Sequence, residues 1–379
     1  MRDFGFAGSP VGGIWRDGRR ALPEVARLRR AAWAFTTRRV PRGSTFKIVT
    51  ESIRPKAGDL ILARVEALGH HASLQLANGR RKHLFVGDEI VVVYGNRYAS
   101  NQFEAVVPES LGPCHLVAGG GVAAKARSWH AKISRGPTEI VPIGLLGDAA
   151  GQPLNVGDYA LQAVDVLDAP CPTAVAVVGT GMDSGKTQTA AYLVRGLTLA
   201  GLRVGYAKVT GTGAGGDTWL LKDAGANPVL DFTDAGLVST YLSSPADLER
   251  VLVTLVAHLT KASVEAVVLE VADGVLQQET AALLKSSAFR EVVSAMLFTA
   301  CDAMGAVAGH AWLQENNLPI VGFGGVLTAS PLQSEEALQA TGLRAFSREE
   351  LCRPGIAMRI LARARRFAAT ATELRSEAS

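Results

Sequence analysis

The second half of the chain alternates short apolar runs with longer amphipathic segments. Its first run, 173–178, is continuously apolar, as expected of a strand that is buried on both faces of a sheet. The pattern then predicts helices at 187–200, 247–260, 277–286 and 304–315, strands at 203–208, 265–270, 295–299 and 319–323, and further helices at the end of the chain. Such short connections between strands and helices predict an α/β fold, a parallel sheet with helices on both faces.

The first half has a different pattern. Strands rich in β-branched and apolar residues are predicted at 59–65, 71–76, 89–94 and 102–107, with Gly- and Asn-containing turns between them. This spacing predicts a smaller β-rich domain, a barrel or a sandwich, over 57–168. Two X-Pro pairs at 169–172 favour extended backbone and mark the boundary to an α/β domain over 173–379.

The first 56 residues form a basic segment, with thirteen Lys and Arg against four Asp and Glu, although the whole chain has a net charge of only +4. A helix is predicted at 22–35, where Pro23 suits the first turn. A basic segment can bind a polyanion or can pair with acidic groups of its own chain. We favour the second interpretation and predict no nucleic-acid partner, because no aromatic interleaving or nucleic-acid motif accompanies the charge.

Composition limits the class of protein. No apolar stretch approaches the roughly 18 residues that a membrane-spanning helix requires, and arginines interrupt any apolar leader near the start. The four cysteines, Cys114, Cys171, Cys301 and Cys352, show no metal-binding spacing and are predicted to be reduced, mostly buried thiols. We therefore predict a cytoplasmic protein without a membrane partner.

The strongest chemical signal directly follows the strand at 173–178 and directly precedes a helix. It consists of Gly179, Thr180, Gly181, Met182, Asp183, Ser184, Gly185, Lys186 and Thr187. A glycine-rich turn at a helix N-terminus directs backbone N–H groups at phosphates. Lys186 is expected to reach the β- and γ-phosphates, and the Thr187 hydroxyl to bind Mg²⁺. The sequence therefore predicts a phosphate-binding loop (P-loop) for a nucleotide.

This loop is one residue longer than the common motif, and Gly-Thr-x-x-x-x-Gly-Lys-Thr resembles the dethiobiotin synthetase family over about residues 173–345. The resemblance implies ATP and Mg²⁺ as cofactors, catalytic roles for Lys186 and Lys208, metal ligands at Thr187, Asp217 and Glu270, and a homodimer. Asp217 can instead be a turn residue, and Asp273 can replace Glu270. The family's adenine-reading asparagine has no counterpart at 324–328, so ATP, GTP and other phosphorylated cofactors remain open.

These features predict an ATP- and Mg²⁺-dependent synthetase that activates a carboxylate or carbamate of a small anionic or amine-bearing substrate. Two alternatives remain: a nucleotide-switched binding module or cofactor-insertion chaperone, and a group transferase using a cofactor such as coenzyme A. An acceptor site is expected in the β-rich domain, where Arg97 stands between Tyr94 and Tyr98 and a Gly-Gly-Gly turn at 119–121 precedes several basic residues.

Overall fold

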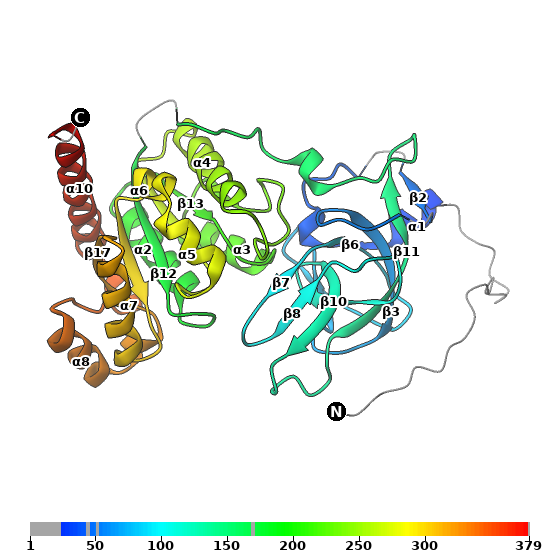
Figure 1. Ribbon diagram of the computed structural model, residues 1–379, viewed down its shortest axis with the longest axis horizontal. Helices are drawn as coiled ribbons and strands as arrows, with labels where there is room; N and C mark the ends of the chain where they lie inside the picture. Colours follow the sequence, from blue (N-terminus) through cyan, green and yellow to red (C-terminus); the bar gives the residue numbers. More distant parts are fainter. Residues whose placement is uncertain (1–23, 43–45, 51–52, 168–170, 378–379) are drawn as a thin grey trace.

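The computed structural model describes residues 24–42, 46–50, 53–167 and 171–377. It has a β-rich N-terminal domain and an α/β C-terminal domain, joined by a connecting segment along one side of the molecule (Figure 1). Each domain buries two hydrophobic clusters, and Val238 of the α/β domain packs into one of the barrel clusters.

The β-rich domain is a barrel. Strands β3 (Leu60–Ala67), β6 (Glu89–Tyr94), β10 (Val122–Trp129), β9 (Cys114–Ala118) and β11 (Thr138–Gly147) pair in that order, and β11 pairs with β3 to close the ring. All of these pairings are antiparallel except β6–β10. The strands predicted at 59–65 and 89–94 correspond to β3 and β6, whereas β9, β10 and β11 were not among the predicted strands.

Shorter elements extend this barrel. They are β1 (Ala32–Trp33), which pairs with β6, β2 (Lys47–Val49), which pairs with β11, and the hairpins β4–β5 (Ser73–Gln75, Arg81–His83) and β7–β8 (Arg97–Tyr98, Phe103–Val106). The helix predicted at 22–35 is shorter in the structure, with α1 spanning Glu24–Arg30. It ends there because the chain adds β1 to the barrel and buries Trp33 in its core.

The α/β domain contains six parallel strands in the order β14 (Val229–Asp231), β13 (Val204–Lys208), β15 (Ala266–Glu270), β12 (Thr173–Gly179), β16 (Ala295–Thr299) and β17 (Ile320–Gly324). Alternate residues of β12 belong to different cores, with Ala176 on one face and Val177 on the other. The continuous apolar pattern of β12 therefore reflects burial on both faces, as predicted.

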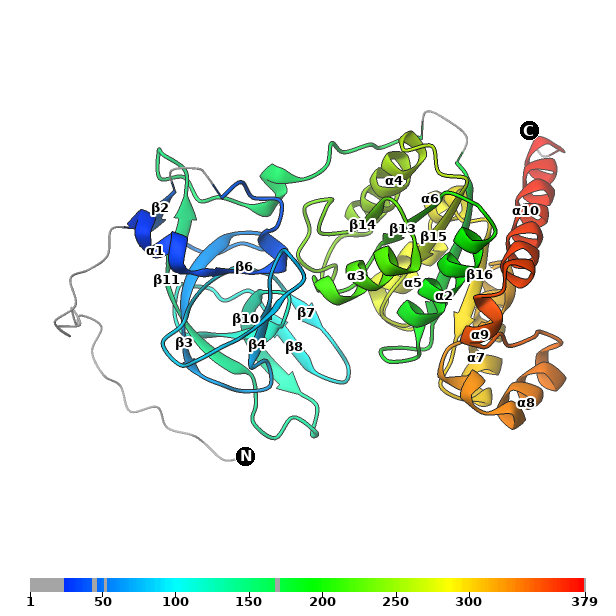
Figure 2. The same cartoon turned by 180° about the vertical axis from the view of Figure 1, so that it is seen from behind.

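Helices cover both faces of this sheet, which confirms the predicted fold class (Figure 2). One face packs against α2 (Lys186–Leu199), α3 (Gly215–Ala224) and α10 (Pro354–Glu377), and the other against α4 (Pro245–Lys261), α5 (Gln278–Lys285), α6 (Ser287–Val292) and α7 (Ala303–Glu315). Two further helices, α8 (Pro331–Thr341) and α9 (Arg348–Leu351), precede α10. Within the described residues, no helix combines the length and apolar composition needed to cross a membrane.

An ion-pair cluster joins the two domains. The Arg38 guanidinium lies 3.1 Å from Asp231 and 2.7 Å from Asp234, and it also donates a hydrogen bond to Thr233. Arg39 adds a longer contact of 3.5 Å to Asp234. Part of the basic segment therefore pairs with acidic groups of its own chain.

The cysteines are free thiols, as predicted, but they are less buried than expected. Cys114 is buried in the barrel, Cys171 and Cys352 are partly buried, and Cys301 is exposed. Cys301 follows the last residues of β16 and precedes Asp302, the N-cap of α7, so it lies on a surface turn rather than in the core.

Candidate functional site

A cleft of about 910 Å³ lies where the two domains meet. The P-loop and the ends of β13 and β15 line it on the α/β side, and residues of the β4–β5 and β7–β8 hairpins line it on the barrel side. The carboxyl ends of parallel strands are where ligands bind in sheets of this kind. The cleft is therefore the candidate functional site.

The P-loop has the geometry of a phosphate cradle at the start of α2. Gly185 is the N-cap residue with φ 96°, and a Cβ at this position would lie 2.9 Å from the Gly325 Cα. Both the left-handed backbone and the close approach require glycine. Beneath the loop, the hydroxyls of Ser184 and Thr299 share a hydrogen bond of 2.8 Å, which fixes the loop to the end of β16.

Lys186 is the first residue of α2 and is 6% exposed. Its Nζ donates a hydrogen bond of 2.6 Å to the Gly181 carbonyl, so the side chain curls over its own loop. Burial lowers the Lys186 pKa, and the carboxylates of Glu270 and Asp273 oppose that shift. An ammonium group held at the loop in this way is placed to meet phosphate oxygens.

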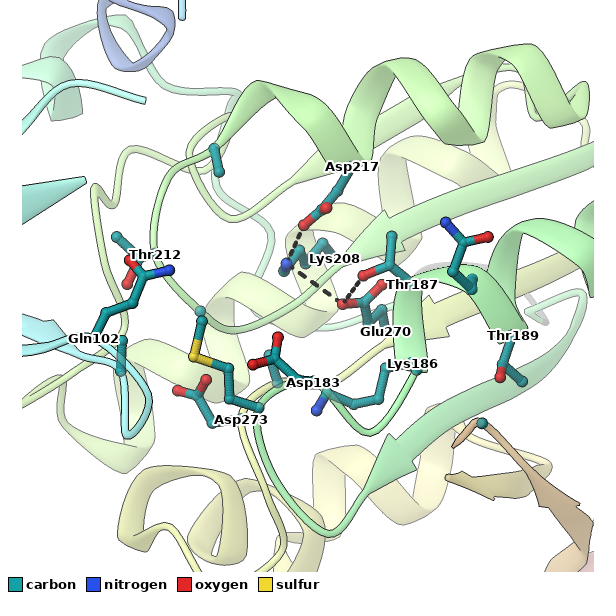
Figure 3. Close-up of a pocket in the computed structure, with 18 of the residues that line it drawn as sticks. Gln102, Asp183, Lys186, Thr187, Thr189, Lys208, Thr212, Asp217, Glu270 and Asp273 are labelled. Carbon is teal, nitrogen blue, oxygen red and sulfur yellow. Dashed lines mark hydrogen bonds and ion pairs between the residues drawn. The ribbon is translucent and has the colours of Figure 1, made fainter. Parts of the chain in front are cut away.

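Glu270, the last residue of β15, is buried beside the P-loop. One carboxylate oxygen accepts a hydrogen bond of 3.0 Å from the Thr187 hydroxyl (Figure 3). The other accepts one of 2.8 Å from the Tyr206 hydroxyl. Tyr206 was not among the predicted site residues, because it lies within an apolar strand and its hydroxyl cannot be placed from the pattern. Burial and the adjacent Glu270 raise the Tyr206 pKa, so its phenol stays protonated and acts as a donor.

Lys208, at the end of β13, joins the two predicted acids. Its Nζ donates to the Asp217 carboxylate and lies 3.4 Å from Glu270 (Figure 3). Burial alone would lower the Lys208 pKa, but the two carboxylates outweigh it and raise the pKa. Asp217 lies in the first turn of α3 rather than in an isolated turn. The structure thus brings together Lys186, Thr187, Lys208, Asp217 and Glu270.

Asp273 also lines the cleft. Burial raises its pKa, and the nearby cations Lys186, Lys208 and Arg97 oppose that shift. The sequence indicated Asp273 as a substitute for Glu270, but the structure places both residues in the cleft. A carboxylate whose pKa is raised has increased basicity.

Donor atoms for a magnesium ion are present at the P-loop. Among the described residues, no three or more His, Cys, Asp or Glu side chains are arranged to bind a metal together. The Thr187 hydroxyl and the Glu270 carboxylate provide oxygen atoms that can bind a metal ion, and the two groups are in hydrogen-bond contact. Mg²⁺ binds through one or two protein oxygens, waters and substrate phosphates, so this donor set fits it.

The barrel domain reaches the P-loop directly. Asn101, in the turn of the β7–β8 hairpin, donates a hydrogen bond of 2.7 Å to the Asp183 carboxylate. Gln75 accepts one of 2.7 Å from the backbone N–H of Gly215, at the start of α3. Gly120, from the Gly-Gly-Gly turn, packs so closely that a Cβ there would lie 2.0 Å from the Gly213 carbonyl oxygen. Residues of both domains therefore form the walls of the cleft and contact each other across it.

No model of a known protein family matches the sequence. No curated protein matches it either.

Solved structures show a partial likeness. The 54 kDa protein of the signal recognition particle from Aeropyrum pernix, in complex with GDP, is 18% identical over 58% of this chain and 54% of that chain, with a TM-score of 0.37. The receptor FtsY from Elizabethkingia anophelis is 14% identical over 50% and 55%, with a TM-score of 0.31. FtsY from Mycoplasma mycoides is 12% identical over 55% and 72%, with a TM-score of 0.33. The chain thus spans about half the length of the first two, and the likeness assigns no function to it.

The strand β12, the glycine-rich turn and the helix α2 give the α/β domain a P-loop nucleotide-binding fold. None of the three structures named above is a dethiobiotin synthetase, so that finer resemblance remains an expectation from the sequence.

Proposed function

We propose that this protein is an ATP- and Mg²⁺-dependent synthetase that activates a carboxylate or carbamate of a small anionic or amine-bearing molecule. The observation that carries the proposal is the shared cleft, in which a P-loop with its lysine and acids faces polar side chains of a second domain. A synthetase requires a nucleotide site and an acceptor site that meet. The resemblance of the P-loop to that of dethiobiotin synthetase supports this choice of reaction and of ATP.

In this proposal the P-loop amides and Lys186 hold the β- and γ-phosphates. A carboxylate oxygen of the acceptor bonds to the γ-phosphorus as the bond from that phosphorus to the β–γ bridging oxygen breaks, and ADP leaves. An amine nitrogen then bonds to the activated carbon, and inorganic phosphate leaves with the electron pair of the broken C–O bond. Asp273 accepts the proton from the nitrogen, because its raised pKa suits a base.

Lys208 neutralises charge on the transferring phosphoryl group, and Asp217 orients its ammonium. Thr187 and Glu270 are the proposed ligands of Mg²⁺. Asp217 is connected to them through Lys208, which contacts both Asp217 and Glu270. The ion, when bound, neutralises phosphate charge.

ADP formation from Mg-ATP tests this function. A small-molecule filtrate of a cell extract should accelerate ADP formation, because the acceptor completes the reaction. Slow turnover that the filtrate leaves unchanged would indicate a nucleotide-switched module, an alternative that the Asn101–Asp183 contact between domains favours. Thermal protection by coenzyme A but not by ATP would indicate a group transferase.

Replacing Glu270 by glutamine is expected to raise the Mg²⁺ concentration required for ATP turnover by about tenfold and to lower the maximal rate by about a hundredfold. The amide keeps the shape and can still accept from Tyr206, but it does not provide a charged oxygen for the ion. Turnover measured across a Mg²⁺ titration checks this.

Glu265→Gln is the matched control, because this residue precedes the same strand β15 and is exposed away from the cleft. An unchanged Mg²⁺ requirement in the Glu270 variant would contradict the proposed metal role.

A further inference from the structure

Arg97 is a buried cation in the wall of the cleft opposite the P-loop. It begins β7, is 5% exposed and lines the cleft together with His71 and Gln102. The other arginines that line the cleft, Arg81 and Arg348, are exposed. Gln102, the partner of Arg97, approaches the cleft from the barrel side in Figure 3.

The hydrogen-bonding capacity of Arg97 is only partly used. Its Nη2 donates to the Gln102 side-chain oxygen at 2.6 Å, and its Nη1 lies 3.1 Å from the His71 Nε2. Its Nε is buried and has no hydrogen-bond partner among the described residues. An arginine has five N–H donors, so at least three of those of Arg97 have no acceptor among the described residues.

His71 cannot fully satisfy the guanidinium. Its Nε2 also lies 2.9 Å from the Val117 carbonyl oxygen. The same ring nitrogen either donates to that carbonyl or accepts from Arg97, but not both. Burial, with contributions from Arg97 and His70, lowers the His71 pKa to about 3, so the ring is neutral and offers no countercharge.

The positive charge of Arg97 has no direct counterion among the described residues. Within the part of the chain that the structure describes, no carboxylate lies at ion-pair distance from it. Burial lowers the Arg97 pKa to about 10, and Asp273, which acts at longer range, opposes the shift. A buried charge without a partner is costly, and a planar fork of donors matches a carboxylate in charge and shape.

We propose that Arg97 binds a carboxylate of the acceptor molecule, so that the cleft takes an organic acid with its anionic group held by the barrel domain. This inference rests on the proposed function, because it identifies the acceptor of that same cleft. One cation beside a neutral imidazole and an amide matches a single negative charge, whereas a dianionic phosphate would bring excess charge into a buried site. Arg97 is thus a binding residue, separate from the P-loop groups that hold the nucleotide.

The test uses the full chain saturated with Mg-ADP and ligand-detected NMR. The probes are the straight-chain dicarboxylates from malonate to adipate, the corresponding diamides, and inorganic phosphate. At least one dicarboxylate should bind the wild type, about tenfold or more tighter than its diamide, and Arg97→Met should weaken it at least about tenfold. Arg80→Met, an exposed arginine of the same domain outside the cleft, should bind as the wild type does.

Three binding results would overturn the inference: no dicarboxylate binds the wild type, the Arg97 variant binds it equally well, or phosphate alone binds through Arg97. Thermal unfolding without ligand separates a structural role from a binding role. Removal of an unpaired buried charge should leave the Tm of Arg97→Met equal to or above that of the wild type. A clear fall in Tm would assign Arg97 to stability and overturn the inference as well.

Failure of the proposed function looks different. If dicarboxylates bind through Arg97 but no acid stimulates ADP formation, the synthetase reaction is wrong and the binding site stands. If acids stimulate ADP formation but binding is indifferent to Arg97, only the carboxylate site is wrong.

Discussion

The Lys186→Ala variant is expected to lose Mg-ATP turnover by about a thousandfold and to bind ATP far more weakly. The reason is geometric, since Lys186 Nζ is held 2.6 Å from the Gly181 carbonyl, within the loop that is proposed to surround the phosphates. Without that ammonium, the developing charge on the phosphoryl group meets only backbone dipoles and the metal. Steady-state ADP release and nucleotide-dependent thermal shifts measure the two effects.

Lys261→Ala is the matched control, because this lysine is exposed at the end of α4 and does not line the cleft. The Tm of the nucleotide-free Lys186 variant should not fall, since burial already disfavours the Lys186 charge. Equal thermal protection of wild type and Lys186→Ala by nucleotide would show that the P-loop is not the binding site.

The Arg38→Ala variant is expected to lose about 3–5 kcal/mol of stability. Arg38 is the main counterion of Asp231 and Asp234, whose side chains are 5% and 10% exposed. Its removal leaves two buried carboxylates facing each other, and burial already raises the Asp234 pKa. The free energy of unfolding from urea titration of the full chain measures the loss.

Arg39→Ala provides the comparison for this cluster. Arg39 lies 3.5 Å from Asp234 and its side chain is 33% exposed, against 16% for Arg38, so its loss should cost at most about 1 kcal/mol. If both variants lose the same small amount, the Arg38 cluster does not hold the domains together.

The sequence predicted the α/β domain well because its strands are buried on both faces. A short run in which every residue is apolar, such as 173–178, is typical of a strand that is buried on both faces. The glycine-rich turn that follows it then marks the start of a helix. The strands β15 and β16 were predicted for the same reason and lie within a residue of the expected bounds.

The α3 helix was not predicted, because Gly215 and Gly216 open it and glycine usually marks a turn. The barrel was harder to predict, since its strands are irregular. Register shifts interrupt the pairing of β10 with β8 and with β9, and of β11 with β3, so side chains do not alternate evenly between core and solvent. The parallel β6–β10 pairing joins segments that local pattern cannot bring together.

The residues of the candidate site also divide into those that local sequence predicts and those that depend on the three-dimensional fold. Lys186 and Thr187 belong to a contiguous motif and could be predicted from spacing alone. Tyr206 could not, because its role depends on which strand lies beside β13 and on where its hydroxyl points. Arg97 was indicated only by its turn and aromatic neighbours, and its unused donors depend on His71 and Gln102 being brought to the same place.

The hydrogen bond from Asn101 to Asp183 makes the shape of the phosphate cradle a joint property of both halves of the chain. In the proposed complex, a shift of this hairpin would alter the loop that meets the phosphates, and a change in the loop would displace the hairpin that carries Arg97. Any coupling that this contact produces between the proposed nucleotide and the proposed acceptor must be reciprocal, so that each ligand changes the affinity for the other by the same factor. The order in which the two ligands bind can then affect how fast the complex with both ligands forms, but not its total binding free energy.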